Sequence, residues 1–168
     1  SPKAREDMQE FIDDVMNAGI RFVYLGEEGE RQCKTFGSRL GLDTDWNGCI
    51  LLSADEKVNY SDLSDIKARL PVGVHQIREH LKHVDDIPLH VSVFAECRGD
   101  QSAKDMIRIY QDHGETVAVT VSALHPNHQL VSSQADLVIA MEPTPLLEQG
   151  KRPMWEVACD WHTLSASL

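Results

Sequence analysis

The sequence has no apolar run of about 18 residues, the length that a membrane-spanning helix needs. It is also poor in basic residues, with 16 Lys and Arg against 27 Asp and Glu and a formal net charge of −11. This charge argues against binding to nucleic acid or to an anionic membrane surface. Since the sequence also lacks a signal-peptide pattern, we expect a soluble domain that faces the cytosol and does not itself insert into a membrane.

The spacing of the cysteines excludes the common metal-finger patterns. None of the four cysteines, Cys33, Cys49, Cys97 and Cys159, forms a CxxC pair. We therefore predict a reducing compartment in which all four serve as small apolar side chains.

Helical and strand patterns alternate along the 168 residues, which are enough for one domain with its own core. Strands are expected at residues 22–25, 89–93, 116–120 and 137–141, with a strand or extended segment at 49–52. Helices are expected near the N-terminus, between Gly29 and Gly41, and at residues 74–84 and 100–113. This order predicts an α/β fold with a parallel sheet and flanking helices.

Helical spacing also predicts which side chains are buried. The expected inward residues are Met8, Phe11, Ile12, Val15 and Met16 in the first helix, and Ala103, Met106, Ile107 and Tyr110 in the last. Residues 53–71 are polar and are expected to form a surface excursion, on which no chemistry is placed. The tail, residues 143–168, is broken by Pro and Gly and is expected to be irregular. Its Trp155 and Trp161 need a cover, from this domain, from other parts of the protein or from a partner.

The segment between the last two predicted strands contains no acid, since Asp and Glu are absent between Glu115 and Asp136. In parallel sheets, functional groups collect in loops at the carboxyl ends of strands, here residues 121–128. A Mg²⁺ ion beside a phosphate needs anionic oxygen ligands, and Ser122 and Asn127 are poor replacements. The segment therefore resembles a phosphate site without its metal ligands.

The same segment and other polar residues suggest further chemistries. His125 and His128 are spaced to share a Zn²⁺ ion, but no further ligand is near in the sequence. Ser122 beside these histidines suggests a hydrolase, but a strained GxSxG turn is absent. Glu27 and Glu28 form either a cation site or, more simply, a solvated acidic turn. His75, His80 and His83 are predicted to lie on the polar surface of the helix at residues 74–84.

Three segments, in order, resemble the phosphorylation domain of P-type ATPases, which has a haloacid-dehalogenase-like fold. Residues 1–42 resemble its helix, AGIR strand, TGD turn and second helix; residues 94–114 (FAECRGDQSAKDMIRIYQDHG) resemble its FARxxPxxK helix; and residues 117–141 resemble its TGDGxND loop with flanking strands. The resemblance covers most of residues 1–142 and implies a Rossmann-like domain there, followed by the tail. The family's strand with the phosphorylated aspartate is absent from the chain. The resemblance thus implies an incomplete sheet, in which strands 22–25 and 116–120 flank a gap that the tail is one candidate to fill.

The resemblance also implies which residues occupy the family's phosphate site. These degenerate positions are Gly26, Glu27 and Glu28 for the TGD turn, Lys104 near the PxxK lysine, Ser122 for the first metal-binding aspartate, and Asn127 for the ND pair. Two carboxylates in the turn would each repel a phosphate by about 1 to 4 kcal/mol at ~4 Å. The resemblance therefore implies a site with no catalytic residue, no metal and no cofactor. The alternative is the phosphorylation domain of an active Mg²⁺-transporting ATPase with unusual ligands.

Segments such as AGIRFVY, LGLDTDWN and LPVGVHQIREHL most resemble one divergent animal branch of these proteins. Its members are P-type-ATPase-like multi-pass proteins of the endoplasmic reticulum linked to magnesium handling. This resemblance implies a non-catalytic domain at the cytosolic face of that membrane, acting as a scaffold or regulatory module. The implied partners are the rest of its own membrane protein and cyclin-M magnesium transporters, and a role in magnesium homeostasis is expected.

Overall fold

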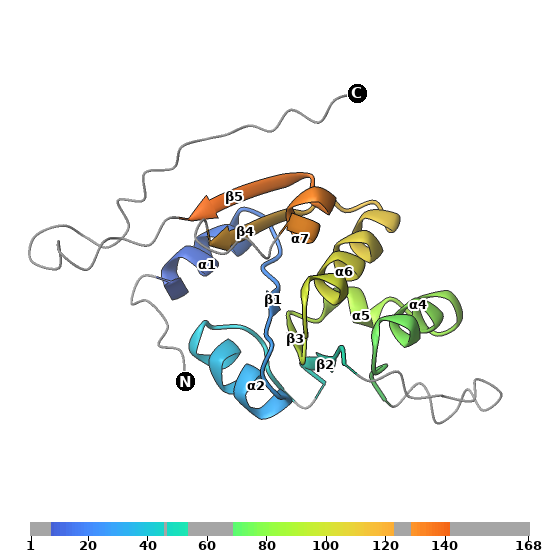
Figure 1. Ribbon diagram of the computed structural model, residues 1–168. Helices are drawn as coiled ribbons and strands as arrows, with labels where there is room; N and C mark the ends of the chain where they lie inside the picture. Colours follow the sequence, from blue (N-terminus) through green and yellow to red (C-terminus); the bar gives the residue numbers. More distant parts are fainter. Residues whose placement is uncertain (1–7, 46, 54–68, 123–128, 142–168) are drawn as a thin grey trace, which may run out of the picture. The chain divides into compact units, whose positions relative to one another are not determined.

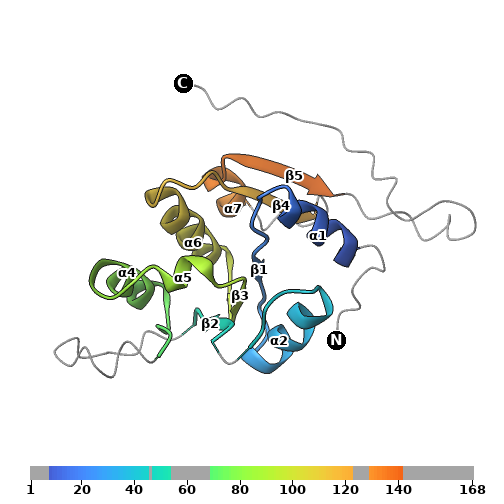
Figure 2. The ribbon, with the colours of Figure 1, turned by 180° about the vertical axis from the view of Figure 1, so that it is seen from behind.

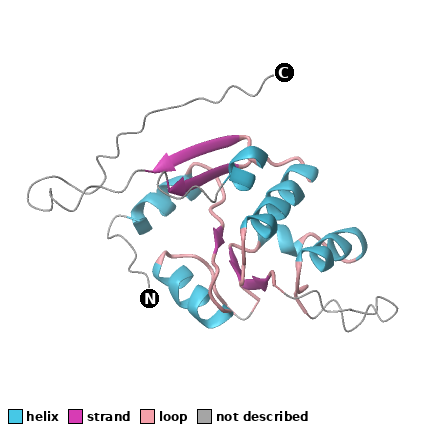
Figure 3. Cartoon of the chain, viewed as in Figure 1, coloured by secondary structure: helices cyan, strands magenta, loops and turns pink. Residues whose placement is uncertain are grey.

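The computed structural model describes residues 8–45, 47–53, 69–122 and 129–141 (Figure 1). Helices and strands alternate along them (Figure 3). The elements are α1 (Met8–Asn17), β1 (Tyr24–Leu25), α2 (Glu30–Arg39), β2 (Cys49–Leu51), α4 (Val74–His83), α5 (Ile87–His90), β3 (Val93–Ala95), α6 (Asp100–Asp112), β4 (Ala118–Ser122), α7 (Gln129–Gln134) and β5 (Leu137–Met141).

The strands form two small parallel sheets, one with the order β1-β3-β2 and one made of β4 and β5. Parallel strands with flanking helices confirm the predicted α/β class and are consistent with an incomplete Rossmann-like fold. The chain divides into two compact units, residues 1–102 and residues 103–168, and each is described by itself. The predicted domain boundary after residue 142 falls outside the described residues and stays a prediction.

The core of the first unit surrounds β3, the central strand of its sheet. All three residues of β3, Val93, Phe94 and Ala95, are 0% exposed. Helix α2 packs closely against β3 at Gly37. A Cβ at this position would lie only 2.9 Å from a methyl group of Val93, so the absence of a side chain allows the close approach. One side of the core contains Ile12, Cys33, Leu40, Leu42, Cys49, Val93 and Ala95. Burial of these apolar side chains is the main force that holds the unit together.

In the second unit, β4 and β5 lie side by side and are connected through α7 (Figures 1 and 2). Polar contacts fix this connection. The Asp136 carboxylate accepts hydrogen bonds from the backbone N–H of Val117 at 2.8 Å and from Gln111 at 3.0 Å. Gln134 donates to Gln111 at 2.7 Å. The predicted inward residues of α6, Ala103, Met106, Ile107 and Tyr110, are all buried.

Two strand predictions are wrong in position. Residues 87–90 form helix α5, and the strand expected at 89–93 begins only at Val93. Pro88 explains the helix, because it lies in the first turn and its ring sets a helical φ. Strand β4 starts at Ala118, two residues later than expected, and runs to Ser122. Before it, the N–H of Val117 bonds to the Asp136 side chain.

The predicted inward face of α1 is too wide. Ile12 is fully buried, but Phe11 is 53% and Met16 is 50% exposed. With 3.6 residues per turn, Phe11 lies about 100° around the helix from Ile12 and so falls off the buried stripe. Met16 follows Ile12 by one turn and lies next to the last residue of the helix, beyond its buried part. Strands 22–25 and 137–141 and the helix between Gly29 and Gly41 are found close to the expected positions.

Candidate functional site

The turn that follows β1 is fixed to the end of β3 by backbone hydrogen bonds. Gly26 donates to the carbonyl of Phe94 at 2.9 Å and accepts from the N–H of Cys97 at 2.9 Å. There is no room for a side chain at Gly26, since a Cβ would lie 2.5 Å from the Sγ of Cys33 and 2.9 Å from the hydroxyl of Tyr24. The sequence therefore needs glycine at this turn.

A second set of contacts links this turn to Glu96, the residue directly after β3. The carbonyl of Glu28 accepts the N–H of Glu96 at 2.9 Å and the thiol of Cys33 at 3.3 Å. The Glu96 carboxylate accepts the hydroxyl of Ser53, which follows β2. Glu96 has a φ of +56°, a left-handed conformation that is uncommon outside glycine.

These contacts define a carboxyl-end cluster, made of Gly26, Glu27, Glu28, Cys33, Ser53, Glu96 and Cys97. It joins the carboxyl ends of all three strands of the first sheet. This is the place where parallel sheets carry their functional groups.

Burial, together with the acidic side chains around the cluster, raises the pKa of its thiols and keeps them protonated. Burial raises the pKa of Cys97 to about 11, with a smaller contribution from the Glu27 and Asp100 carboxylates. Burial, followed by the nearby Glu28 charge, also raises the pKa of Cys33. For Tyr24, burial raises the pKa to about 12, with help from Cys33 and Glu28. Since the thiolate is the reactive form, these cysteines are poor nucleophiles and poor metal ligands at neutral pH.

The cluster thus presents carboxylates and protonated thiols. In the part of the chain that the structure describes, no group of three or more His, Cys, Asp and Glu side chains is arranged to hold a metal ion. Cys33, Cys49 and Cys97 are buried and free, as predicted for small apolar side chains. Cys159 lies outside the described residues.

The described positions of the predicted phosphate site are divided between the two units. Gly26, Glu27 and Glu28 belong to the carboxyl-end cluster of the first unit. In the second unit, Lys104 lies on α6 and Ser122 is the last residue of β4. Asn127 lies outside the described residues, as do His125 and His128. The role of these positions as a degenerate phosphate site stays a prediction.

Sequence reasoning missed Glu96, Cys97 and Ser53 as members of the cluster. The signal was present, because residues just after a buried parallel strand lie at its functional end. Placing the strand at residues 89–93 put its carboxyl end two residues too early and left Glu96 and Cys97 in the following loop. The cluster also depends on a left-handed Glu96, which no local pattern indicates.

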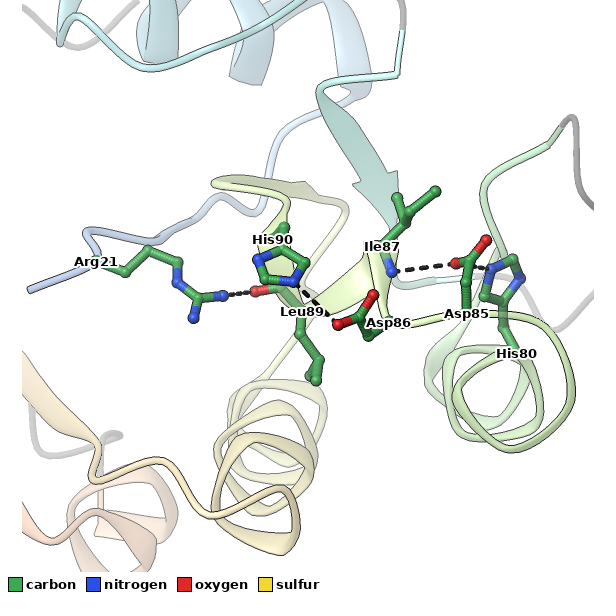
Figure 4. A network of polar contacts seen from close by, with 7 residues as sticks. All are labelled: Arg21, His80, Asp85, Asp86, Ile87, Leu89 and His90. Atoms are coloured by element: carbon green, nitrogen blue, oxygen red, sulfur yellow. Dashed lines mark hydrogen bonds and ion pairs between the residues drawn. The ribbon is translucent and has the colours of Figure 1, made fainter.

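A second polar cluster lies where α4 meets α5 (Figure 4). His80 is 3% exposed, so its prediction as a surface residue is wrong. Its Nε2 lies 2.8 Å from the Asp85 carboxylate, which also accepts the N–H of Ile87 at 3.1 Å. Burial is possible because the imidazole keeps a hydrogen-bond partner. His75 and His83 are exposed, as predicted.

The remaining contacts in Figure 4 fix α5 from its other end. The Arg21 guanidinium donates to the carbonyl of Leu89, and the Nε2 of His90 lies 3.3 Å from the Asp86 carboxylate. These contacts hold α4, α5 and Arg21 together, which indicates a structural role for this region. The Nε2 atoms of His80 and His90 and the carboxylates of Asp85 and Asp86 each have a partner within the fold.

The chain was compared with known proteins. No family model matches it. It is similar to Transmembrane protein 94 of Mus musculus, with 29% identity over 213 residues, and to Transmembrane protein 94 of Homo sapiens, with 28% identity over 213 residues. The matches cover 96% of this chain but 15% of each relative, so the chain spans only a small part of their length. Among the helices that the structure describes, none has both the length and the apolar character to cross a bilayer.

Proposed function

We propose that this chain is a non-catalytic, P-type-ATPase-like domain of a multi-pass membrane protein and that it serves as a scaffold or regulatory module. The similarity to Transmembrane protein 94 supports the membrane-protein setting. A cytosolic position at the endoplasmic reticulum and a role in magnesium homeostasis belong to the same proposal. The proposal also includes cyclin-M magnesium transporters as partners of this domain.

The carboxyl-end cluster is the observation that carries the proposal. A phosphate site needs free backbone N–H groups and positive charge directed at the phosphate oxygens. Here the N–H groups of Gly26, Glu96 and Cys97 already bond to carbonyls of the fold. The adjacent side chains include the carboxylates of Glu27 and Glu28, which repel a phosphate. These bonded N–H groups and carboxylates support the proposal that the domain has kept the fold of a phosphorylation domain but does not transfer phosphoryl groups.

A phosphorylation assay on the complete membrane protein tests the proposal directly. The protein would be incubated with radiolabelled ATP and Mg²⁺, stopped in acid, and treated with hydroxylamine. We expect no acid-stable, hydroxylamine-labile label, whereas an active P-type ATPase treated in parallel gives one. A clear label on the protein would overturn the non-catalytic assignment and favour the Mg²⁺-transporting alternative.

A rescue experiment in cells separates a scaffold from a ligand site. Cells that lack the protein would receive either the parent or a variant with Glu27→Gln, Glu28→Gln and Ser122→Ala, and total cellular magnesium would be measured. We expect equal magnesium content in both cases, because the altered side chains hold neither metal nor phosphate. Deletion of the whole segment should fail to rescue. Loss of rescue by the triple variant at equal protein level would contradict the proposal.

A further inference from the structure

Ser53 and Glu96 connect the carboxyl ends of β2 and β3. The Ser53 hydroxyl donates to the Glu96 carboxylate. The backbone of Glu96 is left-handed, with a φ of +56°, and such a conformation persists only where surrounding contacts hold it. Two of these contacts are backbone bonds, since the Glu96 N–H donates to the carbonyl of Glu28 at 2.9 Å and the Glu96 carbonyl accepts the N–H of Arg98 at 2.8 Å. The Ser53 hydroxyl supplies a third contact, through the side chain.

The contact is favourable because the serine hydroxyl carries a proton and no charge. A phosphate ester at the same oxygen has lost that proton and carries a charge of about −1.5 to −2 at neutral pH. It would face the Glu96 carboxylate, and the Glu28 carboxylate belongs to the same cluster, where both charges act on Cys33. A phosphoserine beside acidic side chains disrupts structure by repulsion. Phosphate on Ser53 would therefore turn the attraction between the ends of β2 and β3 into a repulsion.

The sequence after Ser53 is typical of sites for serine kinases that prefer acidic substrates. Such kinases select by charge, and they recognise carboxylates that follow the serine. Asp55 and Glu56 occupy the second and third positions after Ser53. Ser102 and Ser133 also have an acidic residue at the third position, but none at the second, and they lie within helices α6 and α7. Ser53 lies in neither a helix nor a strand, so no helical turn has to unwind before it can enter a kinase active site.

We propose that Ser53 is a phosphorylation site for a serine kinase that prefers acidic substrates, and that the phosphate separates the ends of β2 and β3. The kinase transfers the γ-phosphoryl group of ATP to the Oγ of Ser53, and ADP and the hydroxyl proton are released. The inference rests on the proposed function, because it supplies the signal to which a regulatory module responds. The two fail separately, since hydroxylamine cleaves the aspartyl phosphate of an active ATPase but leaves phosphoserine intact.

Kinase treatment of the full 168-residue chain tests the modification. The parent and a double variant with Asp55→Asn and Glu56→Gln would be incubated with ATP, Mg²⁺ and a purified serine kinase that phosphorylates acidic sites in casein. Mass spectrometry would locate the phosphate. We expect phosphate on Ser53 of the parent and severalfold slower transfer to Ser53 of the double variant. An unmodified Ser53 in the folded chain would overturn the proposal, most directly when a peptide of residues 47–60 is modified under the same conditions.

Thermal melting tests the effect of the added charge. Ser53→Asp introduces a carboxylate opposite Glu96, and Ser53→Asn is the matched control of nearly equal size without charge. We expect Ser53→Asp to melt lower than Ser53→Asn by roughly 2 to 8 °C, and Glu96→Gln to remove most of this difference. If Ser53→Asp does not fold, the phosphorylated and untreated parent chains are compared instead, with the same expected shift. Equal melting temperatures for the two Ser53 variants, or an equal difference between them in the Glu96→Gln background, would overturn the proposal.

Discussion

Replacement of Gly26 by alanine tests the geometry of the carboxyl-end cluster. The new Cβ would lie 2.5 Å from the Sγ of Cys33 and 3.0 Å from a ring carbon of Tyr24. Gly26 cannot move away, because its N–H bonds to Phe94 and its carbonyl to Cys97, each at 2.9 Å. Cys33 is 1% exposed on the packed face of α2, so its thiol has little space to retreat.

The expected cost follows from the overpacking of well-filled cores. Inserting one methyl group into such a site destabilises a protein by about 1 to 3 kcal/mol. For a chain of this size, that loss corresponds to a melting temperature lower by roughly 2 to 12 °C. Circular dichroism or calorimetric melting of the parent and Gly26→Ala chains measures it.

A double-mutant cycle identifies the clash partner. Cys33→Ala removes the sulfur atom, so Gly26→Ala should cost less in that background than in the parent, by about 0.5 kcal/mol or more. Gly29→Ser is the matched glycine control, because nothing lies within 4 Å of the Cβ position at Gly29 and serine is well suited to this N-cap. Its effect should stay within about 0.5 kcal/mol. An unchanged melting temperature in Gly26→Ala, or an equal loss with and without Cys33, would refute the packing described here.

Three further predictions concern single side chains. Gly29→Ser should stabilise the chain by about 0.5 kcal/mol, measured by urea unfolding, because Gly29 caps α2 in an extended conformation without a side-chain bond. Hydrogen bonds from the Val117 N–H and then Gln111 lower the pKa of Asp136. The stability it contributes is therefore present above the usual Asp range and is lost as pH falls through the lowered pKa. Asp136→Asn should cost about 1 kcal/mol at neutral pH, and a pH series of unfolding curves should show parent and variant converging in acid. His80→Ala should cost about 2 to 3 kcal/mol, whereas exposed His83→Ala should stay within about 0.5 kcal/mol; equal melting temperatures would contradict the buried pair.

Much of the fold was predictable because local patterns determine it. The run at residues 137–141 is short, apolar and β-branched, and it is β5. Cys33 and Leu40 lie at helical spacing before Gly41, and both are buried on or beside α2. The strand around residue 91 was misplaced because the alternating apolar residues Leu89, Val91 and Val93 run from a short helix, which has Pro88 in its first turn, into the start of β3.

The candidate site was less predictable, because it depends on contacts between segments far apart in sequence. Gly26 and Glu28 were found from the turn after an apolar strand. Glu96 and Ser53 join them only through hydrogen bonds that span the sheet. The burial of His80 likewise requires Asp85 across the α4–α5 corner.

By itself, the sequence determined the alternation of helices and strands, the strong negative charge and the absence of acid between Glu115 and Asp136. These properties are local or additive, so they can be derived without knowing which segments meet. Only the tertiary structure decided that the strands form two parallel sheets and that backbone N–H groups at the carboxyl ends of β1 and β3 are already bonded. Each of these depends on register and on pairing between distant residues, and no single stretch of sequence contains that information.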